Sequence, residues 1–423
     1  MAKPRGNCLV AQSGGPTAVI NSSAAGVIQE ALKQKLGRVF AARNGILGVL
    51  REELFDAGAE GAAAIEALRR APSAALGSCR FKIKSLEESR AHYDRILEVF
   101  NAHDIRYFFY IGGNDSMDTA DKLAQLARQV NYELIVMGVP KTIDNDLAHT
   151  DHCPGYGSVA KYMATTAMEA GLDTEALYTA DTCTVMETMG RNAGWIAAAT
   201  GVAHRTEQDA PHLVYLPEVP FSIEKFVADV KDCLRRIGRC FIVAAEGIAD
   251  ASGQYIADQG ASAFGKDAFG HTQLGGVGDV LKTIVEQQVR AKCRSVRPST
   301  AQRVAEHFAS KTDSDEAYLV GKKAVQLAAA GTSGYMVTLI RKSSSPYRCT
   351  TGMIELAQVA NADRKVPRDW INDAGNHITP ELRDYIIPLM RGEVKTQIGR
   401  DGLPVYVRLQ RRLLEKNTPE YKA

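Results

Sequence analysis

Apolar residues gather in short unbroken runs along the first third of the chain, and helical patterns separate several of these runs. The runs are "NCLVAQ", "RVFAAR", "RYFFYIGG" and "YELIVMGVP". Continuous apolar stretches of this length are typical of strands buried on both faces of a parallel sheet. The segment "EESRAHYDRILEVF" places Tyr93, Ile96, Leu97 and Phe100 on one face of a helix. This alternation of strand and helix predicts an α/β sheet.

A second group of predicted strands begins after a helical pattern over residues 157–172. These strands are "TCTVMET", "HLVYLP" and "RCFIVAAEG". Phe226, Val227, Val230 and Leu234 recur at helical spacing before the last of them, so we expect a second α/β unit. The polar stretch "SKTDSDEA" indicates a loop or a helix start. The charged tail after residue 392 either packs on the body or frays.

Composition sets the class of protein. The chain has 423 residues, of which 45% are apolar and 24% charged, as in ordinary globular proteins with room for two domains. Lys and Arg number 51 against 49 Asp and Glu. This balance gives no broad basic field that nucleic acid or an anionic membrane would attract. Any specificity for anions must be local.

The cysteines indicate a reducing compartment. They form no C-x-x-C pair and show no cysteine–histidine spacing typical of zinc, so we expect buried reduced thiols. No apolar run is long enough to be a signal segment or to cross a bilayer, and we expect a cytoplasmic protein. The eight cysteines are Cys8, Cys79, Cys153, Cys183, Cys233, Cys240, Cys293 and Cys349.

Three polar loops, each after a predicted strand, share one chemistry. They are "VAQSGGPTAVIN", "FYIGGNDSMDTA" and "VPKTIDND". Loops at the carboxyl ends of parallel strands converge on one crevice. Two Gly-Gly turns, Gly14-Gly15 and Gly112-Gly113, would let backbone amides approach phosphate ahead of helix N-termini. A single such turn often serves only a positive φ angle, whereas two of them favour phosphate binding.

The third loop brings Lys141 next to Asp144 and Asp146. A solvated turn with a surface ion pair is the simpler interpretation, since Asn and Asp favour turns. A cation among carboxylates after a strand, combined with the two glycine turns, favours phosphoryl chemistry instead.

Four motifs together resemble the phosphofructokinase family, especially its diphosphate-dependent branch. The motifs are "GGNDS", "PKTIDND", "MGRNAGW" and "VAAEG", and the similarity is strongest over residues 8–201. The resemblance implies two Rossmann-like parallel-sheet domains with the active site in the cleft between them. Residues 1–155 with about 301–360 would form the phosphoryl-donor domain, and residues 156–300 with about 361–423 the fructose 6-phosphate domain. The implied reaction is magnesium-dependent transfer of a phosphoryl group from diphosphate to the 1-hydroxyl of fructose 6-phosphate.

The resemblance also assigns roles within the "PKTIDND" loop. Asp144 matches the base that accepts the proton of the sugar hydroxyl. Lys141 and Asp146 complete the catalytic group, and magnesium, Lys141 and Arg191 would neutralise phosphate oxygens. The implied ligands of Mg²⁺ are Asp144, Asp146 and, through water, Asn114.

The sugar site is assigned on further matches. Two arginines keep the nine-residue separation of a pair that binds the 6-phosphate in the family. Some of these arginines come from a neighbouring subunit in relatives, so the resemblance implies a homodimer in which Arg294 acts across the interface. Thr182 and Thr300 depart from the family pattern at neighbouring positions. The implied sugar residues are Thr142, Asp144, Met189, Gly190, Arg191, Glu246, Arg294 and Arg303.

The donor is predicted from Asp115 and Lys141. ATP-using relatives commonly have glycine where this chain has Asp115, and a carboxylate there would clash with the α-phosphate of a nucleotide. Lys141 also matches the diphosphate branch, and Arg80 matches a donor-contacting arginine of ATP-using relatives. The implied diphosphate site comprises Gly14, Gly15, Gly113, Asp115 and Lys141.

Other functions remain open from the sequence. An ATP-dependent 6-phosphofructokinase is the nearest alternative, and a non-catalytic regulatory subunit of the same fold is another. Kinases acting on NAD or lipid share Gly-Gly-Asp-like turns but lack the other motifs. A dinucleotide-dependent oxidoreductase is disfavoured because no G-x-G-x-x-G opens the first strand–helix turn.

Overall fold

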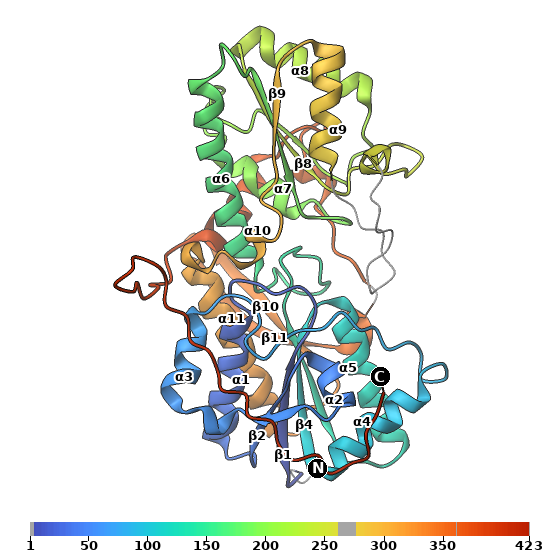
Figure 1. Cartoon of the computed structure of the whole chain (residues 1–423). Helices are drawn as coiled ribbons and strands as arrows, with labels where there is room; N and C mark the ends of the chain where they lie inside the picture. The colour runs from blue at the N-terminus through green and yellow to red at the C-terminus, as the bar shows by residue number, and fades with distance from the viewer. Residues whose placement is uncertain (1–3, 261–275, 361, 423) are drawn as a thin grey trace.

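The computed structural model describes residues 4–260, 276–360 and 362–422. Two α/β units lie end to end along the long axis of the molecule, each built on its own sheet (Figure 1). The chain passes between the units several times. Both units therefore contain segments that are distant in the sequence.

The larger unit contains a seven-stranded sheet in the order β11-β10-β5-β4-β1-β2-β3. Its inner strands are parallel, and β3 and β11 pair antiparallel at the two edges. The four apolar runs predicted as strands form β1, β2, β4 and β5. The strands are β1 Asn7–Gln12, β2 Val39–Ala42, β3 Leu54–Asp56, β4 Ile105–Gly112, β5 Ile135–Pro140, β10 Tyr335–Ser344 and β11 Tyr347–Glu355.

Helices cover both faces of this sheet. On one face α1 (Ile20–Gln34) packs beside α11 (Lys311–Ala329), with the short α3 (Ala62–Ala67) nearby. The two long helices approach closely, because a Cβ on Gly26 would lie 2.3 Å from the Tyr318 carbonyl oxygen. The other face is covered by α2 Gly45–Leu50, α4 Arg90–Ala102, α5 Asn114–Gln129 and α12 Leu356–Val359.

The smaller unit contains a four-stranded parallel sheet in the order β7-β8-β6-β9. Its strands are β6 Cys183–Thr188, β7 Leu213–Tyr215, β8 Cys240–Ala245 and β9 Cys293–Val296. One face packs against α6 Tyr156–Ala176, α7 Trp195–Thr200 and α13 Pro380–Ile386, and the other against α8 Ile223–Ile237 and α9 Val277–Ile284.

Short helical turns connect these elements. The four-residue α10 (Ala301–Val304) lies where the chain returns from β9 towards α11. A single π-helical turn, Val285–Val289, ends α9. The 3₁₀ turns are Gly58–Glu60, Leu68–Arg70, Gly201–Ala203, Ile256–Gly260, Glu306–Phe308, Arg368–Trp370 and Ile387–Met390.

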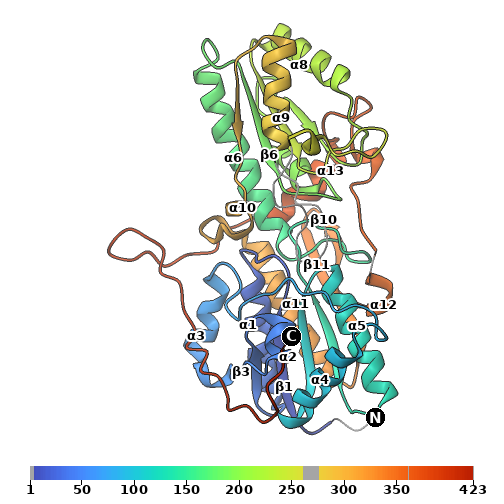
Figure 2. The same ribbon diagram turned by 45° about the vertical axis from the view of Figure 1, so that its right-hand side comes forward.

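The C-terminal segment departs from the predicted domain boundaries. Residues 366–389 pack against the smaller sheet, but the chain then crosses to the larger unit and runs along it to its end (Figure 2). Leu409 joins the core beside α1, and the Leu414 amide donates to the Leu54 carbonyl at 2.7 Å. The physical reason is that β3 is an edge strand whose backbone groups and apolar side chains need a cover. The tail therefore does not belong wholly with residues 156–300 and does not fray.

The cysteines are free thiols, as predicted, and all except Cys349 are buried. Within the described residues, no helix is long and apolar enough to cross a membrane.

Candidate active site

Loops at the carboxyl ends of β1, β4 and β5 meet in a crevice that faces the smaller unit. Two adjoining cavities of about 260 and 390 Å³ open there. The residues that line both cavities are Gly15, Lys141, Thr142, Asp144, Asp146 and Asn192. The two cavities therefore meet at the loop that follows β5.

Backbone contacts close this loop on itself. The Lys141 amide donates to the Gly112 carbonyl at 3.0 Å, which ties the loop to the end of β4. Asn145 adopts a φ of 54° and accepts a hydrogen bond from the Cys153 amide at 2.9 Å. Asparagine tolerates this left-handed conformation better than most residues. The carboxylates on either side of Asn145 are thereby fixed relative to β5.

Lys141 is held as a buried cation. Only 3% of it is exposed, and its ammonium donates to the Gly15 carbonyl at 2.9 Å. Burial lowers its pKa to about 8, against the opposing effect of Asp144. Gly14 makes room for it, because a Cβ there would lie 3.1 Å from the Lys141 Nζ atom. The Gly14 amide donates to the Cys79 carbonyl at 3.1 Å and is engaged within the chain, while Gly14 itself lines the second cavity.

The carboxyl groups in the crevice share a desolvated environment. Burial raises the pKa of Asp144, and the negative charge of Glu246 adds to this effect. Burial also raises the pKa of Asp146, with a further contribution from Asp144. For Glu246, burial raises the pKa to about 7. Carboxyl groups that titrate closer to neutral pH are suited to exchanging protons with a substrate hydroxyl.

Residues predicted for the sugar gather around the first cavity. Met189, Arg191, Glu246 and Arg303 line it. Gly190 lies between two lining residues with a φ of 126°, where only glycine is unstrained. The Nε atoms of Arg191 and Arg303 are buried without a hydrogen-bond partner. Buried donors of this kind are normally satisfied, and a phosphate is a suitable partner for guanidinium groups.

Arg294 lies apart from these residues. It is on β9, where its guanidinium forms an ion pair with Asp181, and it lines neither cavity. Within one chain, the structure therefore does not bring Arg294 to Arg303. Arg297, which the sequence analysis missed, lies closer to the sugar side, with its Nε atom 3.3 Å from Glu187. Its charge also helps to hold down the pKa of Glu246.

The second cavity opens at the N-terminus of α5. Gly113 is the residue before this helix, and a Cβ on Gly112 would lie 2.1 Å from the Ser116 hydroxyl oxygen, so the turn is tight. Asn114 donates to Asp363 at 2.9 Å, and Asn192 donates to the same carboxylate at 3.2 Å. Asp363 thus links the donor turn to the "MGRNAG" loop. No sequence signal indicated it, because it lies outside residues 8–201, where the family resemblance is strongest.

Asp115 lines this cavity as predicted, but its charge is paired. The Lys82 ammonium lies 2.8 Å from an Asp115 oxygen. The electrostatic part of the predicted repulsion of a nucleotide is therefore weakened by this pairing, while the bulk of the side chain remains. The segment "CRFKIK" carries a signal for Lys82, because apolar and cationic residues alternate in it with the period of an extended strand.

Oxygen atoms suited to a hard divalent cation are present at the junction of the cavities. The Asp146 Oδ1 and Asn114 Oδ1 atoms are both buried without a hydrogen-bond partner. Carboxylate and amide oxygens of this kind fit Mg²⁺, which commonly keeps waters and substrate phosphates as its other ligands. Among the described residues, no group of three or more His, Cys, Asp or Glu side chains is placed to hold a metal alone.

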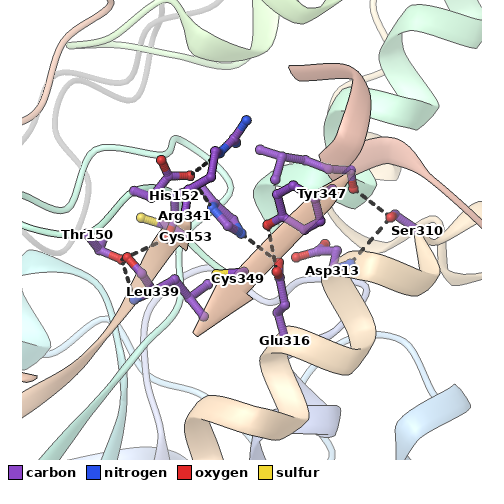
Figure 3. Close-up of polar contacts among 12 residues, drawn as sticks. Thr150, His152, Cys153, Ser310, Asp313, Glu316, Leu339, Arg341, Tyr347 and Cys349 are labelled. Atoms are coloured by element: carbon purple, nitrogen blue, oxygen red, sulfur yellow. Dashed lines mark hydrogen bonds and ion pairs between the residues drawn. The ribbon is translucent and has the colours of Figure 1, made fainter. Parts of the chain in front are cut away.

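A buried polar network anchors the far end of the catalytic loop (Figure 3). His152 lies between Asp151 at 2.7 Å and Glu316 of α11 at 2.6 Å. Arg341 of β10 donates to Asp151 at 3.0 Å, and the Tyr347 hydroxyl donates to Glu316 at 2.7 Å. The network joins the segment that follows the loop to α11, β10 and β11.

This network predicts a pH-dependent stability. Burial lowers the pKa of His152, but Glu316 and Asp151 outweigh it and raise the pKa to about 9. The stabilisation is complete below the unfolded-state pKa of about 6.5 and is lost as the pH rises through 9. We expect unfolding in urea to show a loss on the order of 3 kcal/mol across this window. His152→Gln should remove most of this slope, whereas His149→Gln, at an exposed histidine, should retain it. An unchanged slope in His152→Gln would assign the pH dependence to another group.

Comparison with known proteins agrees with this geometry. The profile of a family described as Phosphofructokinase matches residues 7–327. A pyrophosphate–fructose 6-phosphate 1-phosphotransferase of Xanthomonas campestris is 50% identical over 420 residues, covering 99% of each chain. A protein of the same name from Halomonas elongata is 46% identical over 419 residues, covering 98% of this chain and 99% of the relative.

A solved structure is equally similar over its whole length. The crystal structure of a pyrophosphate-dependent phosphofructokinase from Marinobacter aquaeolei superposes with a TM-score of 0.89 at 44% identity, covering 99% of this chain and 100% of that one. The sequence motifs, the two-unit fold and the placement of the crevice residues lead to one conclusion. The chain belongs to the phosphofructokinase family.

Proposed function

We propose that the protein catalyses the reversible transfer of a phosphoryl group from diphosphate to the 1-hydroxyl of fructose 6-phosphate. The products are fructose 1,6-bisphosphate and phosphate. The observation that carries this proposal is the meeting of two cavities at Lys141, Asp144 and Asp146. One cavity holds arginines and a glutamate suited to a sugar phosphate, and the other lies at a helix N-terminus suited to phosphate. The names of the full-length relatives support the same reaction.

Asp144 acts as the general base. Its carboxylate accepts the proton of the sugar 1-hydroxyl, and the hydroxyl oxygen forms a bond to the nearer phosphorus of diphosphate. The bond from that phosphorus to the bridging oxygen breaks, and phosphate leaves with the electron pair. Because the raised pKa of Asp144 makes it a better proton acceptor, the step proceeds without a strong external base.

Cationic groups stabilise the charge that is redistributed in this step. Lys141 lies at the junction of the cavities, where its ammonium is buried and positioned by Gly15. Arg191 and Arg303 hold the sugar phosphate on the other side. In a desolvated site such fixed charges act more strongly than in water and need no reorganisation during the reaction.

Magnesium completes the proposed site. Asp146 and Asn114 would hold the ion through their unpartnered oxygens. When bound, it offsets the negative charge of the diphosphate oxygens. The proposed setting is the cytoplasm, where the free thiols of this chain would stay reduced.

An ATP-dependent reaction is the second candidate, because Arg80, which matches a donor-contacting arginine of ATP-using relatives, lines the first cavity. Phosphorus-31 NMR distinguishes the chemistry directly. Incubation with fructose 6-phosphate, magnesium and diphosphate should produce the resonance of a phosphate attached to carbon 1 of the sugar. One equivalent of free phosphate should appear with it. No consumption of diphosphate would reject the proposed reaction.

Substitution of the arginines on the sugar side is expected to affect KM for fructose 6-phosphate more than KM for diphosphate. Arg191→Ala and Arg303→Ala should raise KM for fructose 6-phosphate at least about ten-fold, because each loses a charged hydrogen bond to the sugar phosphate. KM for diphosphate should change much less. Arg290→Ala, a substitution outside both cavities, is the control in the same steady-state assay. A larger rise in KM for diphosphate would move the two arginines to the donor side.

Arg294 fits this scheme only through a second copy of the chain. We propose a homodimer in which Arg294 of one protomer reaches the sugar site of its partner. Its half-exposed position on β9, outside its own chain's crevice, supports this assignment. A fully active monomer at assay concentration would reject it.

A further inference from the structure

Lys82 lies in an extended segment that presents alternate residues to opposite sides. Cys79 and Ile83 are buried, and Arg80, Lys82 and Lys84 are exposed. An extended chain places residues i and i+2 on one face, so the three cations share one exposed face of the segment. Arg80 lines the first cavity and Lys82 lines the second. The segment is therefore a cationic border along both cavities.

Contacts at both ends fix the backbone of this segment. The Cys79 carbonyl accepts a hydrogen bond from the Gly14 amide at 3.1 Å. The Tyr93 hydroxyl donates to the Lys84 carbonyl at 3.0 Å. Between them, the Phe81 ring packs edge-on against His92 with 5.5 Å between ring centroids. The position of the Lys82 backbone is thus determined by the core of the larger unit.

The Lys82 ammonium meets the carboxylate of Asp115 in the first turn of α5. The two atoms lie 2.8 Å apart, and both side chains also border the second cavity. The hydrogen bond to Asp115 raises the pKa of Lys82, so the lysine is charged throughout the neutral range. Asp118, one helical turn on, is itself paired with Lys122 at 2.5 Å. The Asp115 charge is consequently balanced chiefly by Lys82.

We propose that Lys82 is a specificity-determining residue of the donor site, which acts by pairing with Asp115. The pair occupies the space beside the α5 N-terminus where ATP-using relatives have glycine, and it does so without a net negative charge. Diphosphate carries several negative charges, and an unpaired carboxylate at this position would repel it as strongly as it would repel a nucleotide. Asp115 can therefore exclude a nucleotide by its bulk only because Lys82 cancels its charge. This inference rests on the proposed diphosphate-dependent reaction.

Steady-state kinetics of two lysine variants test the inference. Lys82→Met should raise KM for diphosphate at least about ten-fold, because Asp115 is left as an uncompensated charge in the donor cavity. KM for fructose 6-phosphate and the melting temperature should stay close to those of the unmodified protein. Lys84→Met is the matched control, since Lys84 is exposed on the same segment and borders neither cavity.

The same lysine substitution in an Asp115→Asn protein distinguishes charge pairing with Asp115 from direct contact of Lys82 with diphosphate. In Asp115→Asn the carboxylate charge is absent and the shape is nearly retained. There, Lys82→Met should change KM for diphosphate less than about three-fold, since no charge remains to be balanced. An equal effect in both backgrounds, or no effect in either, would overturn the inference. Turnover of diphosphate by the unmodified protein keeps the proposed function intact in both cases, whereas its absence would reject the proposed function itself.

Discussion

Replacing Asp144 by asparagine is expected to lower kcat by at least about two orders of magnitude, the usual contribution of a general base. Asparagine keeps the size of the side chain but accepts no proton from the sugar hydroxyl. The Asp144 backbone amide donates to the Thr142 hydroxyl oxygen at 3.1 Å, and the substitution leaves this bond in place because it does not use the Asp144 side chain. KM for fructose 6-phosphate should change little, since Arg191 and Arg303 still bind the phosphate.

The measurement is the initial rate of the purified variant at saturating substrates. Circular dichroism and melting temperature serve to show that the variant is folded. Glu98→Gln, at an exposed carboxylate of α4, is the control for a charge change far from the crevice. A kcat within a few-fold of that of the unmodified protein would remove Asp144 from the role of base.

Lys141→Met should lower kcat/KM for diphosphate by about two to three orders of magnitude. The ammonium is buried beside two carboxylates, and its loss leaves their charges and those of diphosphate uncompensated. Loss of one fixed donor in a desolvated active site has effects of this size in other enzymes. Methionine retains most of the apolar length of lysine, so packing against the glycine turn should survive.

A comparison with Lys84→Met tests whether the effect is specific to the buried ammonium. The two variants are assayed with diphosphate varied at saturating fructose 6-phosphate. Lys84→Met should keep kcat/KM near that of the unmodified protein. Equal losses in both variants would indicate a general effect of positive charge and not the action of Lys141.

The strands that carry the site were predictable because they are buried on both faces. Continuous apolar runs such as β1 and β5 admit few other interpretations. β10 and β11 were not predicted, since only the start of β10 is a continuous buried run, and the rest of β10 and all of β11 consist of half-buried and exposed residues near the edge of the sheet. The tail was misassigned for a related reason. Its apolar residues pack against distant segments, such as Leu414 beside the edge strand β3 and Tyr421 beside His92 of α4, and no local pattern indicates these partners.

The site residues show the same difference between local patterns and tertiary contacts. Lys141, Asp144 and Asp146 were predicted because they share one short loop. Their closest new partners come from distant segments: Asp363 contacts Asn114 across 249 positions of the sequence, and Lys82 meets Asp115 from the segment before α4. The alternation in "CRFKIK" indicates that Lys82 is exposed, but no local pattern indicates its partner, because pairings of this kind depend on tertiary folding. The charge state of the donor pocket, which these pairings decide, was therefore the feature that sequence patterns described least well.

Donor preference is the most direct test of the central claim that the crevice transfers phosphoryl groups from diphosphate. The measurement is the ratio of kcat/KM for diphosphate to kcat/KM for ATP, taken in a coupled assay with fructose 6-phosphate and magnesium. We predict a ratio above about 100, because the Lys82–Asp115 pair occupies space that a nucleotide needs without adding a net negative charge to the cavity. A ratio below one would contradict the account and favour an ATP-dependent enzyme.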